Sequence, residues 1–440
     1  MHPLLKIIEN RKKDIKSGIV SICSANRYVV EASMNRARKE NTYLLIEATA
    51  NQVNQFGGYT GMRPADFKQF IFEIADKNGF DKDMIILGGD HLGPLVWKDL
   101  PETIAMKNAE NLVREFVSAG FSKIHLDTSM RLQTDNPNEE LKISIIAKRG
   151  ALLCKAAEEA AKDLLIKPVY IIGSEVPIPG GSCEKDDIVS VTTVDNFILT
   201  YETYQKVFNG LGLDKAFNRV IGVVVQPGVE FGDETIHSYD RTKAVELANA
   251  LKGYDNIVFE GHSTDYQLPE LLKQMNDDGI AILKVGPALT FAMREGLMAL
   301  ELIEKAIIRK KDRSRFTKAL ESSMNNNPVH WIKHYHGSDR QLKIKRKFSY
   351  SDRCRYYLPE EKVNAAIDKL IKNLSDKKIP ITLISQYMPV QYIKIRRGIL
   401  KNSPINLLWD KIDNLLDDYY YAIKTVNCTD ENGRMTYEEI

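Results

Sequence analysis

Acidic residues and histidines stand side by side where short apolar runs of this sequence end. Asp90 and His91 follow the run 84–87 and have glycine on both sides, which leaves the backbone free to turn sharply. Such a pair can be a hydrogen-bonded turn, or it can combine an acid/base with a metal ligand. The choice depends on whether other apolar runs end in the same way.

Eight short apolar or β-branched runs predict eight strands, and most of them alternate with helical patterns such as 64–78 and 103–119. Gly79 and Gly120 fall just after these two helical patterns, where a C-terminal cap favours glycine. Alternation of strands and helices predicts parallel pairing with helical crossovers. Eight such units favour a (β/α)₈ barrel over an open doubly wound sheet. The predicted strands are 18–23, 42–48, 84–89, 123–127, 168–175, 219–226, 256–262 and 281–286.

The 440 residues are enough for such a barrel and a further region. Strand patterns fade after residue 295, whereas helical patterns continue at 295–320, 360–376 and 404–425. We therefore predict an α/β protein with a (β/α)₈ TIM barrel over residues 1–295. A mainly helical C-terminal extension over residues 296–440 is expected to pack on the barrel.

Composition excludes several classes of protein. A net charge of +2 gives no overall field that would favour nucleic acid. No apolar run approaches the length of a membrane span, and the first residues do not form a signal peptide. The five cysteines are scattered without a CxxC pair, which fits a reducing compartment. The expectation is a cytoplasmic protein that binds neither nucleic acid nor membrane.

In a (β/α)₈ barrel the functional residues lie at the C-terminal ends of the strands. The predicted strand ends of this chain are crowded with chemically active side chains. A buried charge is costly unless it is paired, hydrogen-bonded or bound to a metal. Such side chains at most of the eight ends indicate a polar cavity built for chemistry. They are Glu47, Asp90, His91, His125, Asp127, Glu175, Gln226, Glu260, His262 and Lys284.

His91 and His262 end two different predicted strands, and each alone could be a hydrogen-bonded core histidine. Together, two imidazoles with a carboxylate or amide suit zinc or another divalent transition metal, with Mg²⁺ as an alternative. His125 alternates with Asp127, so both should face the same side of their strand. If Asp127 points into the barrel, His125 lies one layer deeper, where we expect a structural hydrogen-bond partner.

Phosphate binding is the second expected property of the cavity. The sequence contains neither GxxxxGK[ST] nor a GxGxxG after a predicted strand, so nucleotide sites of those types are unsupported. Barrels often bind phosphate at the loops after strands seven and eight. There, Gly286 would offer backbone amides, and Ser263 and Lys284 further donors. Arg353 and Arg355 could bring guanidinium groups over the site, with a structural Asp–Arg pair as an equal alternative.

Eight segments, in order, resemble the Z-type subunit of D-tagatose-1,6-bisphosphate aldolase, the GatZ/KbaZ family. The resemblance runs from about residue 18 to about residue 425. Asn54, in the first segment, becomes a candidate substrate contact. The segments are NQVNQFGGYTGM (51–62), ILGGDHLGP (86–94), AGFSKIHLDTSM (119–130), GSEVPIPGG (173–181), VVVQPGVEF (223–231), HSTDYQ (262–267), LKVGPALTFAMRE (283–295) and ISQYMP (384–389).

The Z-type family is itself similar to the class II, metal-dependent aldolases, which are (β/α)₈ barrels. The resemblance implies that Asp90 is the acid/base and that His91 and His262 bind the metal. It also implies that Asp127 and Glu175 belong to a second cation site and take part in catalysis.

This chain departs from the class II aldolases after the sixth predicted strand. Those enzymes have a third zinc histidine there, whereas this sequence reads Gln226-Pro227-Gly228-Val229-Glu230. Gln226, Glu230 or Glu175 would then complete the metal shell, with weaker or altered metal preference.

The resemblance implies tagatose-phosphate metabolism and reversible cleavage of the C3–C4 bond of a ketose phosphate. The activity would be that of a D-tagatose 6-phosphate 4-epimerase or of a D-tagatose-1,6-bisphosphate aldolase component. One alternative is a non-catalytic subunit required by a Y-type aldolase, and another is a sugar-phosphate-binding protein without metal. Some members are described as tagatose-6-phosphate kinases, which the missing phosphate-loop motif disfavours. A homo-oligomer is expected.

Overall fold

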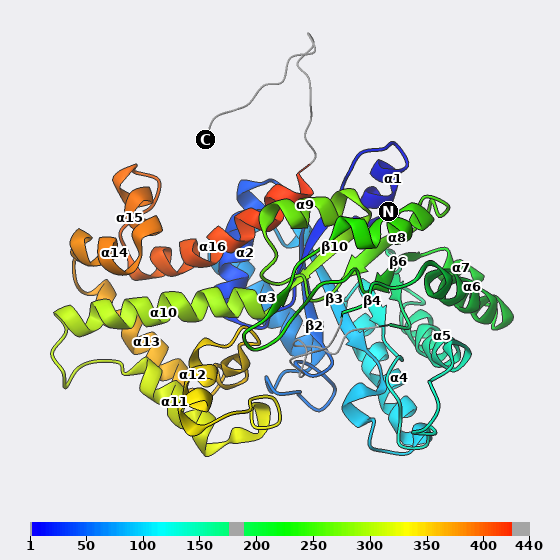
Figure 1. The fold of residues 1–440 in the computed structure, drawn as a ribbon, viewed down its shortest axis with the longest axis horizontal. Helices are drawn as coiled ribbons and strands as arrows, with labels where there is room; N and C mark the ends of the chain where they lie inside the picture. The colour runs from blue at the N-terminus through cyan, green and yellow to red at the C-terminus, as the bar shows by residue number, and fades with distance from the viewer. Residues whose placement is uncertain (1, 176–188, 425–440) are drawn as a thin grey trace, which may run out of the picture.

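A closed barrel of eight parallel strands forms the centre of the computed structural model, which describes residues 2–175 and 189–424 (Figure 1). Each strand pairs with its neighbours in the order β1-β10-β9-β6-β5-β4-β3-β2. This confirms the predicted (β/α)₈ barrel. The strands are β1 (Ile19–Ile22), β2 (Leu44–Thr49), β3 (Ile85–Leu92), β4 (Lys123–Leu126), β5 (Val169–Ile172), β6 (Val220–Val225), β9 (Val258–Gly261) and β10 (Ile280–Val285).

Helices follow the strands and cover the outside of the barrel, and the two helices predicted in detail are present. Gly79 and Gly120 end α3 and α4 with left-handed backbone, φ 60° and 98°, which suits glycine. The barrel helices are α2 (Arg27–Lys39), α3 (Pro64–Asn78), α4 (Glu102–Ala119), α5 (Ile143–Ala160), α6 (Val194–Gly210), α7 (Asp214–Phe217), α8 (Arg241–Leu251), α9 (Pro269–Asp277) and α10 (Pro287–Ile307). A short hairpin, β7 (Glu230–Phe231) and β8 (Ile236–His237), follows β6.

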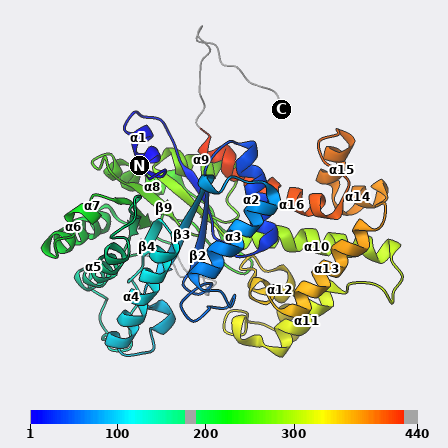
Figure 2. The same cartoon turned by 180° about the vertical axis from the view of Figure 1, so that it is seen from behind.

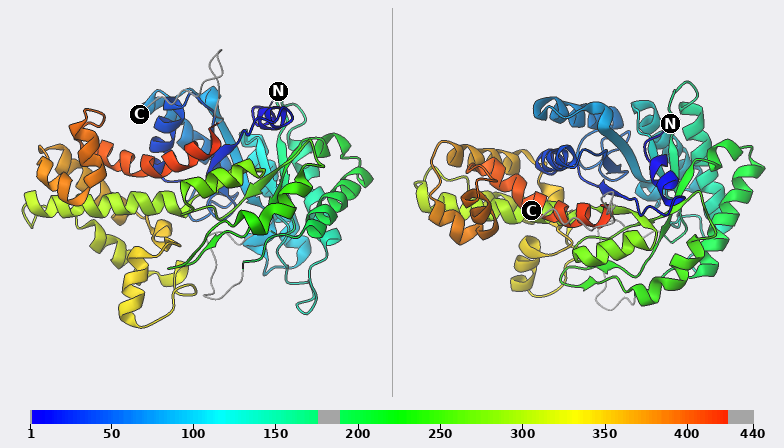
Figure 3. Two further views of the ribbon diagram at one scale, coloured as in Figure 1. Left: turned by 45° about the horizontal axis from the view of Figure 1, so that its top comes forward. Right: turned by 90° about the horizontal axis from the view of Figure 1, so that it is seen from above.

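The C-terminal region forms a helical extension on one side of the barrel, seen from behind in Figure 2. Its last helix runs back and packs against α2, α9 and α10 (Figure 3). The extension and the barrel therefore share one continuous apolar core. The extension contains α11 (Phe316–Asn326), α12 (Asp339–Phe348), η4 (Arg353–Tyr357), α13 (Glu361–Ser375), α14 (Ile381–Tyr387), α15 (Pro389–Arg396) and α16 (Pro404–Ile423).

One predicted helix is wrong in its extent. The pattern at 295–320 suggested a single helix, but α10 ends at Ile307 and α11 begins at Phe316. Arg315, just before α11, has a left-handed backbone with φ 58°, which a continuous helix cannot contain. The predicted boundary at residue 295 falls inside α10, and residues 425–440 of the predicted extension lie outside the described residues.

The N-terminal end of the barrel is closed by the short helix α1 (Leu5–Arg11). Leu4, Ile7 and Ile8 pack there with the apolar side chains that fill the lower barrel, such as Leu45 and Ile282. Because this end is filled, the polar strand ends open only towards the opposite face. Among the described residues, no helix is both long and apolar enough to cross a membrane.

Candidate functional site

A β-bulge in β3 brings two successive side chains into the barrel. Successive strand residues normally point to opposite faces. The register of β3 against β4 shifts between Gly89 and Leu92, and His91 has a left-handed backbone with φ 47°. Such a bulge re-aims a side chain, so Asp90 and His91 both reach the interior. A β-carbon on Gly93 would lie 1.6 Å from the carbonyl oxygen of Asp127, so the chain passes β4 too closely for any side chain.

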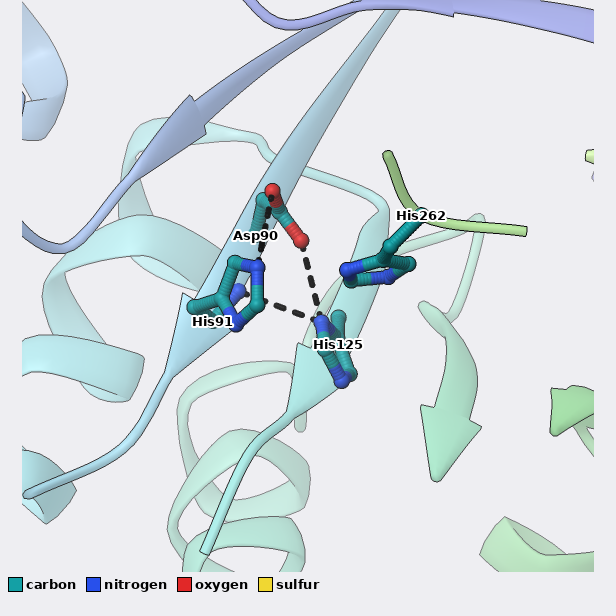
Figure 4. Close-up of side chains that lie close together, drawn as sticks. All are labelled: Asp90, His91, His125 and His262. Carbon is teal, nitrogen blue, oxygen red and sulfur yellow. Dashed lines mark hydrogen bonds and ion pairs between the residues drawn. The ribbon is translucent and has the colours of Figure 1, made fainter. Parts of the chain in front are cut away.

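Asp90, His91, His125 and His262 form a cluster at the carboxyl ends of three strands (Figure 4). One ligand atom from each residue lies within 4.8 Å of all the others, and all four residues are buried. Three imidazoles and a carboxylate are a donor set that zinc and other divalent transition metals accept. The residues of this cluster therefore fit a divalent metal ion.

Two of the imidazoles are oriented by carboxylates behind them. Nδ1 of His91 lies 2.8 Å from Oδ2 of Asp127, and Nε2 of His262 lies 2.9 Å from Oε1 of Glu260. These bonds leave Nε2 of His91 and Nδ1 of His262 as the ring nitrogens that would be free to bind a metal, the orientation found in carboxylate–histidine–metal arrangements. Burial lowers the pKa of His262 to about 3, so this ring is neutral at physiological pH, as a ligand must be.

Among the described residues, His125 is hydrogen-bonded through only one of its two ring nitrogens. Its Nδ1 accepts the backbone N–H of His91 at 3.2 Å and also lies 3.0 Å from Oδ1 of Asp90. A single nitrogen cannot accept the first bond and donate the second in one tautomer. If Nδ1 donates to Asp90, the lone pair of the ring lies on Nε2, which is buried and has no hydrogen-bond partner among the described residues, so Nε2 would be free to bind a cation.

A fully buried layer of charge lies beneath the cluster. Nζ of Lys123 lies 2.7 Å from Glu47 and 2.5 Å from Glu260. Nζ of Lys284 lies 2.9 Å from Oδ1 of Asp90 and 3.3 Å from Glu47. Burial alone would lower the pKa of Lys284, but Asp90 and the glutamates outweigh it and hold that pKa well above its usual value. Lys284 is therefore a fixed cation that neutralises the acids around it.

A pocket opens above the cluster and is lined by residues of both the barrel and the extension. Seven of the residues predicted for the site from sequence lie in its wall. The extension contributes Arg355 and Tyr356 from η4, which reaches over the strand ends. The predicted residues that line it are Asp90, His91, His262, Ser263, Lys284, Gly286 and Arg355.

Three predicted ligands have hydrogen-bond partners outside this cluster. Glu175 accepts hydrogen bonds from Thr192 Oγ1 and Asn196 Nδ2, both at 2.6 Å. Oε1 of Gln226 accepts the backbone N–H groups of residues 228 and 229, both at 2.9 Å, and so closes its own loop. Oε1 of Glu230 accepts the backbone N–H of Phe231. None of the three lines the pocket described above.

The remaining predicted residues also have structural contacts. Asn54 accepts backbone N–H groups of residues 56 and 58 through Oδ1 and donates to Ala50, which shapes the loop after β2. Arg353 donates to the carbonyl of His330 at 3.1 Å. Asp127, predicted as a catalytic carboxylate, holds His91 and Ser129.

Sequence reasoning missed the place of His125 in the cluster and the role of Asp265. His125 does make structural hydrogen bonds, as expected, but its ring also lies among the candidate ligands. The alternation of Lys123, His125 and Asp127 on one face of β4 was the available signal. No sequence pattern marked Asp265, which lines the pocket and binds backbone across two loops.

Comparison with known proteins gives a family for nearly the whole chain. A solved structure described as a probable tagatose 6 phosphate kinase from Sinorhizobium meliloti 1021 is 44% identical, with a TM-score of 0.85 over 92% of this chain and 100% of that one. A fructose-bisphosphate aldolase from Campylobacter jejuni is 15% identical, with a TM-score of 0.47 over 84% of this chain and 91% of that one. Residues 4–424 match the family described as D-tagatose-1,6-bisphosphate aldolase subunit GatZ/KbaZ-like, and the chain belongs to that family.

Proposed function

We propose that this chain catalyses metal-dependent cleavage and re-formation of the C3–C4 bond of a ketose phosphate, as a D-tagatose 6-phosphate 4-epimerase or a D-tagatose-1,6-bisphosphate aldolase component. The observation that carries the proposal is the buried cluster of three imidazoles and Asp90 in a pocket at the strand ends. Membership of the aldolase subunit family supports the substrate class.

His91, His125 and His262 would hold the metal, with Asp90 beside it. When bound, a divalent cation would act as a Lewis acid that polarises the ketose carbonyl. Asp127 and Glu260 would keep two of these imidazoles in the binding orientation. The buried surroundings strengthen each of these electrostatic contacts.

Asp90 is the candidate base of the reaction. It would take the proton from the C4 hydroxyl, the C3–C4 bond would break, and its electron pair would pass towards the C2 carbonyl. If the aldehyde turned over, C3 attacked it again to re-form the C3–C4 bond and Asp90 returned the proton to O4, the product would be the C4 epimer. Protonation at C3 and release of the aldehyde would instead complete aldol cleavage. Lys284, 2.9 Å from Asp90, would keep the carboxylate ionised before the proton moves.

A second candidate is a non-catalytic subunit of a Y-type aldolase. The description of the family as an aldolase subunit favours it. The cluster argues for chemistry, because buried charges are costly to keep without a partner or a metal. A kinase activity has less support, because the sequence lacks a phosphate-loop motif.

The first experiment incubates the purified protein with D-tagatose 6-phosphate and with the 1,6-bisphosphate, with and without added divalent metal. Products are followed by NMR. We expect metal-dependent formation of fructose 6-phosphate or of triose phosphates, reduced at least 100-fold in Asp90→Asn and His91→Ala. His336→Ala, at an exposed histidine of the extension, serves as the matched control and should leave turnover unchanged.

The subunit alternative predicts a different set of results. The chain alone would show no turnover, and wild type and the two cluster variants would activate an added Y-type aldolase equally. That outcome would refute the catalytic proposal.

A further inference from the structure

The carboxylate of Asp265 occupies the start of α10. Its Oδ1 accepts the backbone N–H of Gly286 at 3.1 Å and that of Ala288 at 2.8 Å. Asp265 belongs to the loop after β9, so it caps the helix from a different loop. Its side chain is only 3% exposed and lines the pocket above the cluster.

These amides are the donors that a (β/α)₈ barrel commonly offers to a substrate phosphate. The first N–H groups of a helix are unpaired within it and carry partial positive charge, and α10 is a long helix of 21 residues. In this chain a carboxylate of the protein already takes that place. Burial raises the pKa of Asp265 to about 6, which leaves the group mainly ionised at neutral pH. An incoming phosphate would therefore meet both occupied donors and a like charge.

The neighbouring residue holds the Asp265 loop in place. Thr264 donates through Oγ1 to the carbonyl of Lys284 at 2.6 Å, and its own carbonyl accepts the hydroxyl of Tyr419 at 2.8 Å. The loop is thus tied to β10 and to α16. Thr264 is fully buried, so moving the carboxylate away from the helix would break contacts in the core.

The charges around the pocket suit one phosphate better than two. Its wall contains the carboxylates Asp90 and Asp265 and the cations Lys284 and Arg355, which balance. A bound divalent metal would add two positive charges. One phosphate monoester carries about −1.5 to −2 at pH 7, so a second would be left without a counter-charge.

We propose that Asp265 determines substrate specificity, because its carboxylate occupies the position at the start of α10 that a phosphate would take. The substrate is then a ketose monophosphate whose end near α10 is uncharged. This inference rests on the proposed function for the substrate class. The role of Asp265 itself is supported by its hydrogen bonds to the two backbone amides.

The test measures binding of inorganic phosphate by calorimetry at pH 7.5 to the full chain and to Asp265→Ser. Serine removes the charge and frees the two amides, so we expect phosphate to bind at least tenfold tighter than to wild type. The matched control is Asp240→Asn, which removes one charge from an exposed aspartate that caps α8 and should change the affinity less than twofold. A folded Asp265→Ser protein with phosphate affinity within twofold of wild type overturns the proposal.

A second measurement covers the case in which Asp265→Ser does not fold. Tagatose 6-phosphate and tagatose 1,6-bisphosphate are titrated into Asp90→Asn, which keeps Asp265 and is expected not to turn the sugars over. The proposal predicts that the bisphosphate binds no tighter than the monophosphate. Tenfold tighter binding of the bisphosphate overturns it.

The proposed function and the proposed role of Asp265 can be refuted independently. Absence of turnover by wild type alone, together with equal activation of a Y-type aldolase by wild type and the cluster variants, refutes the proposed function. The comparison with inorganic phosphate still decides whether Asp265 occupies an anion position, because it needs no catalysis.

Discussion

At the scale of single residues, the hydrogen-bond partner of each imidazole determines which of its ring nitrogens faces the cluster. Asp127 and Glu260 each fix one ring nitrogen of a histidine and leave the other to bind. His125 differs, because its Nδ1 faces both the Asp90 carboxylate and a backbone N–H. Its Nε2 is buried and has no hydrogen-bond partner among the described residues.

Replacement of His125 by alanine is predicted to weaken metal binding by at least tenfold, because one of three imidazole ligands is lost. The measurement is the metal content after dialysis against graded chelator, determined by elemental analysis. His336→Ala should retain the wild-type content.

The contrary result is also informative. If His125→Ala keeps the wild-type metal affinity while its thermal stability falls, the ring only supports Asp90 and His91 through hydrogen bonds. The metal would then be bound by His91 and His262, with Asp90 beside it.

At the scale of elements, the bulge at the end of β3 is the feature on which the site depends. It directs Asp90 and His91 to the same side and brings the chain against β4 at Gly93. Adjacent strands can approach this closely only where no β-carbon intervenes.

Gly93→Ala is predicted to destabilise the fold by at least about 2 kcal/mol, because its β-carbon would overlap the backbone of Asp127 and push β3 and β4 apart. Urea unfolding measures the loss. Gly210→Ala is the matched control, since a β-carbon there meets nothing within 4 Å at the end of α6. Alanine at that position should be neutral or stabilising by up to about 1 kcal/mol. Equal stabilities of the two variants would contradict the account of the bulge.

At the scale of the whole molecule, the C-terminal extension completes the pocket. Arg355 and Tyr356 belong to η4, directly after Asp352. Asp352 forms a fully buried ion pair with Arg294 of α10 at 2.8 Å and accepts Thr290 Oγ1 at 2.7 Å. This pair joins the extension to the last barrel helix beside the strand ends.

Asp352→Asn is predicted to cost about 3–5 kcal/mol of unfolding free energy, because it leaves the Arg294 guanidinium buried without a counter-charge. Asparagine tolerates the left-handed backbone of this position, φ 43°, so the loss reports the charge. The double variant Arg294→Met/Asp352→Asn should recover part of the stability. Urea unfolding of both variants tests this, and a loss below about 1 kcal/mol for Asp352→Asn would contradict it.

Local sequence patterns predicted the barrel and seven residues of the pocket wall. Alternating strand and helix patterns depend on local periodicity, which the chain carries residue by residue. The strand ends followed from that periodicity, and Asp90, His91, His262, Ser263 and Lys284 lie in the pocket wall as a barrel requires.

Which polar residues come into contact depends on the packing of the whole chain. His125 joins the cluster because the bulge in β3 brings His91 beside it. The register between two strands depends on how they pair, so the sequence of one strand alone does not predict it. Gln226 and Glu175 are hydrogen-bonded to nearby backbone and side chains. Their ligand-type side chains alone therefore did not show whether they reach the cluster. Asp265 caps α10 across two loops, and Arg355 arrives from the extension. These contacts join segments far apart in the chain, and the packing of the whole molecule fixes them.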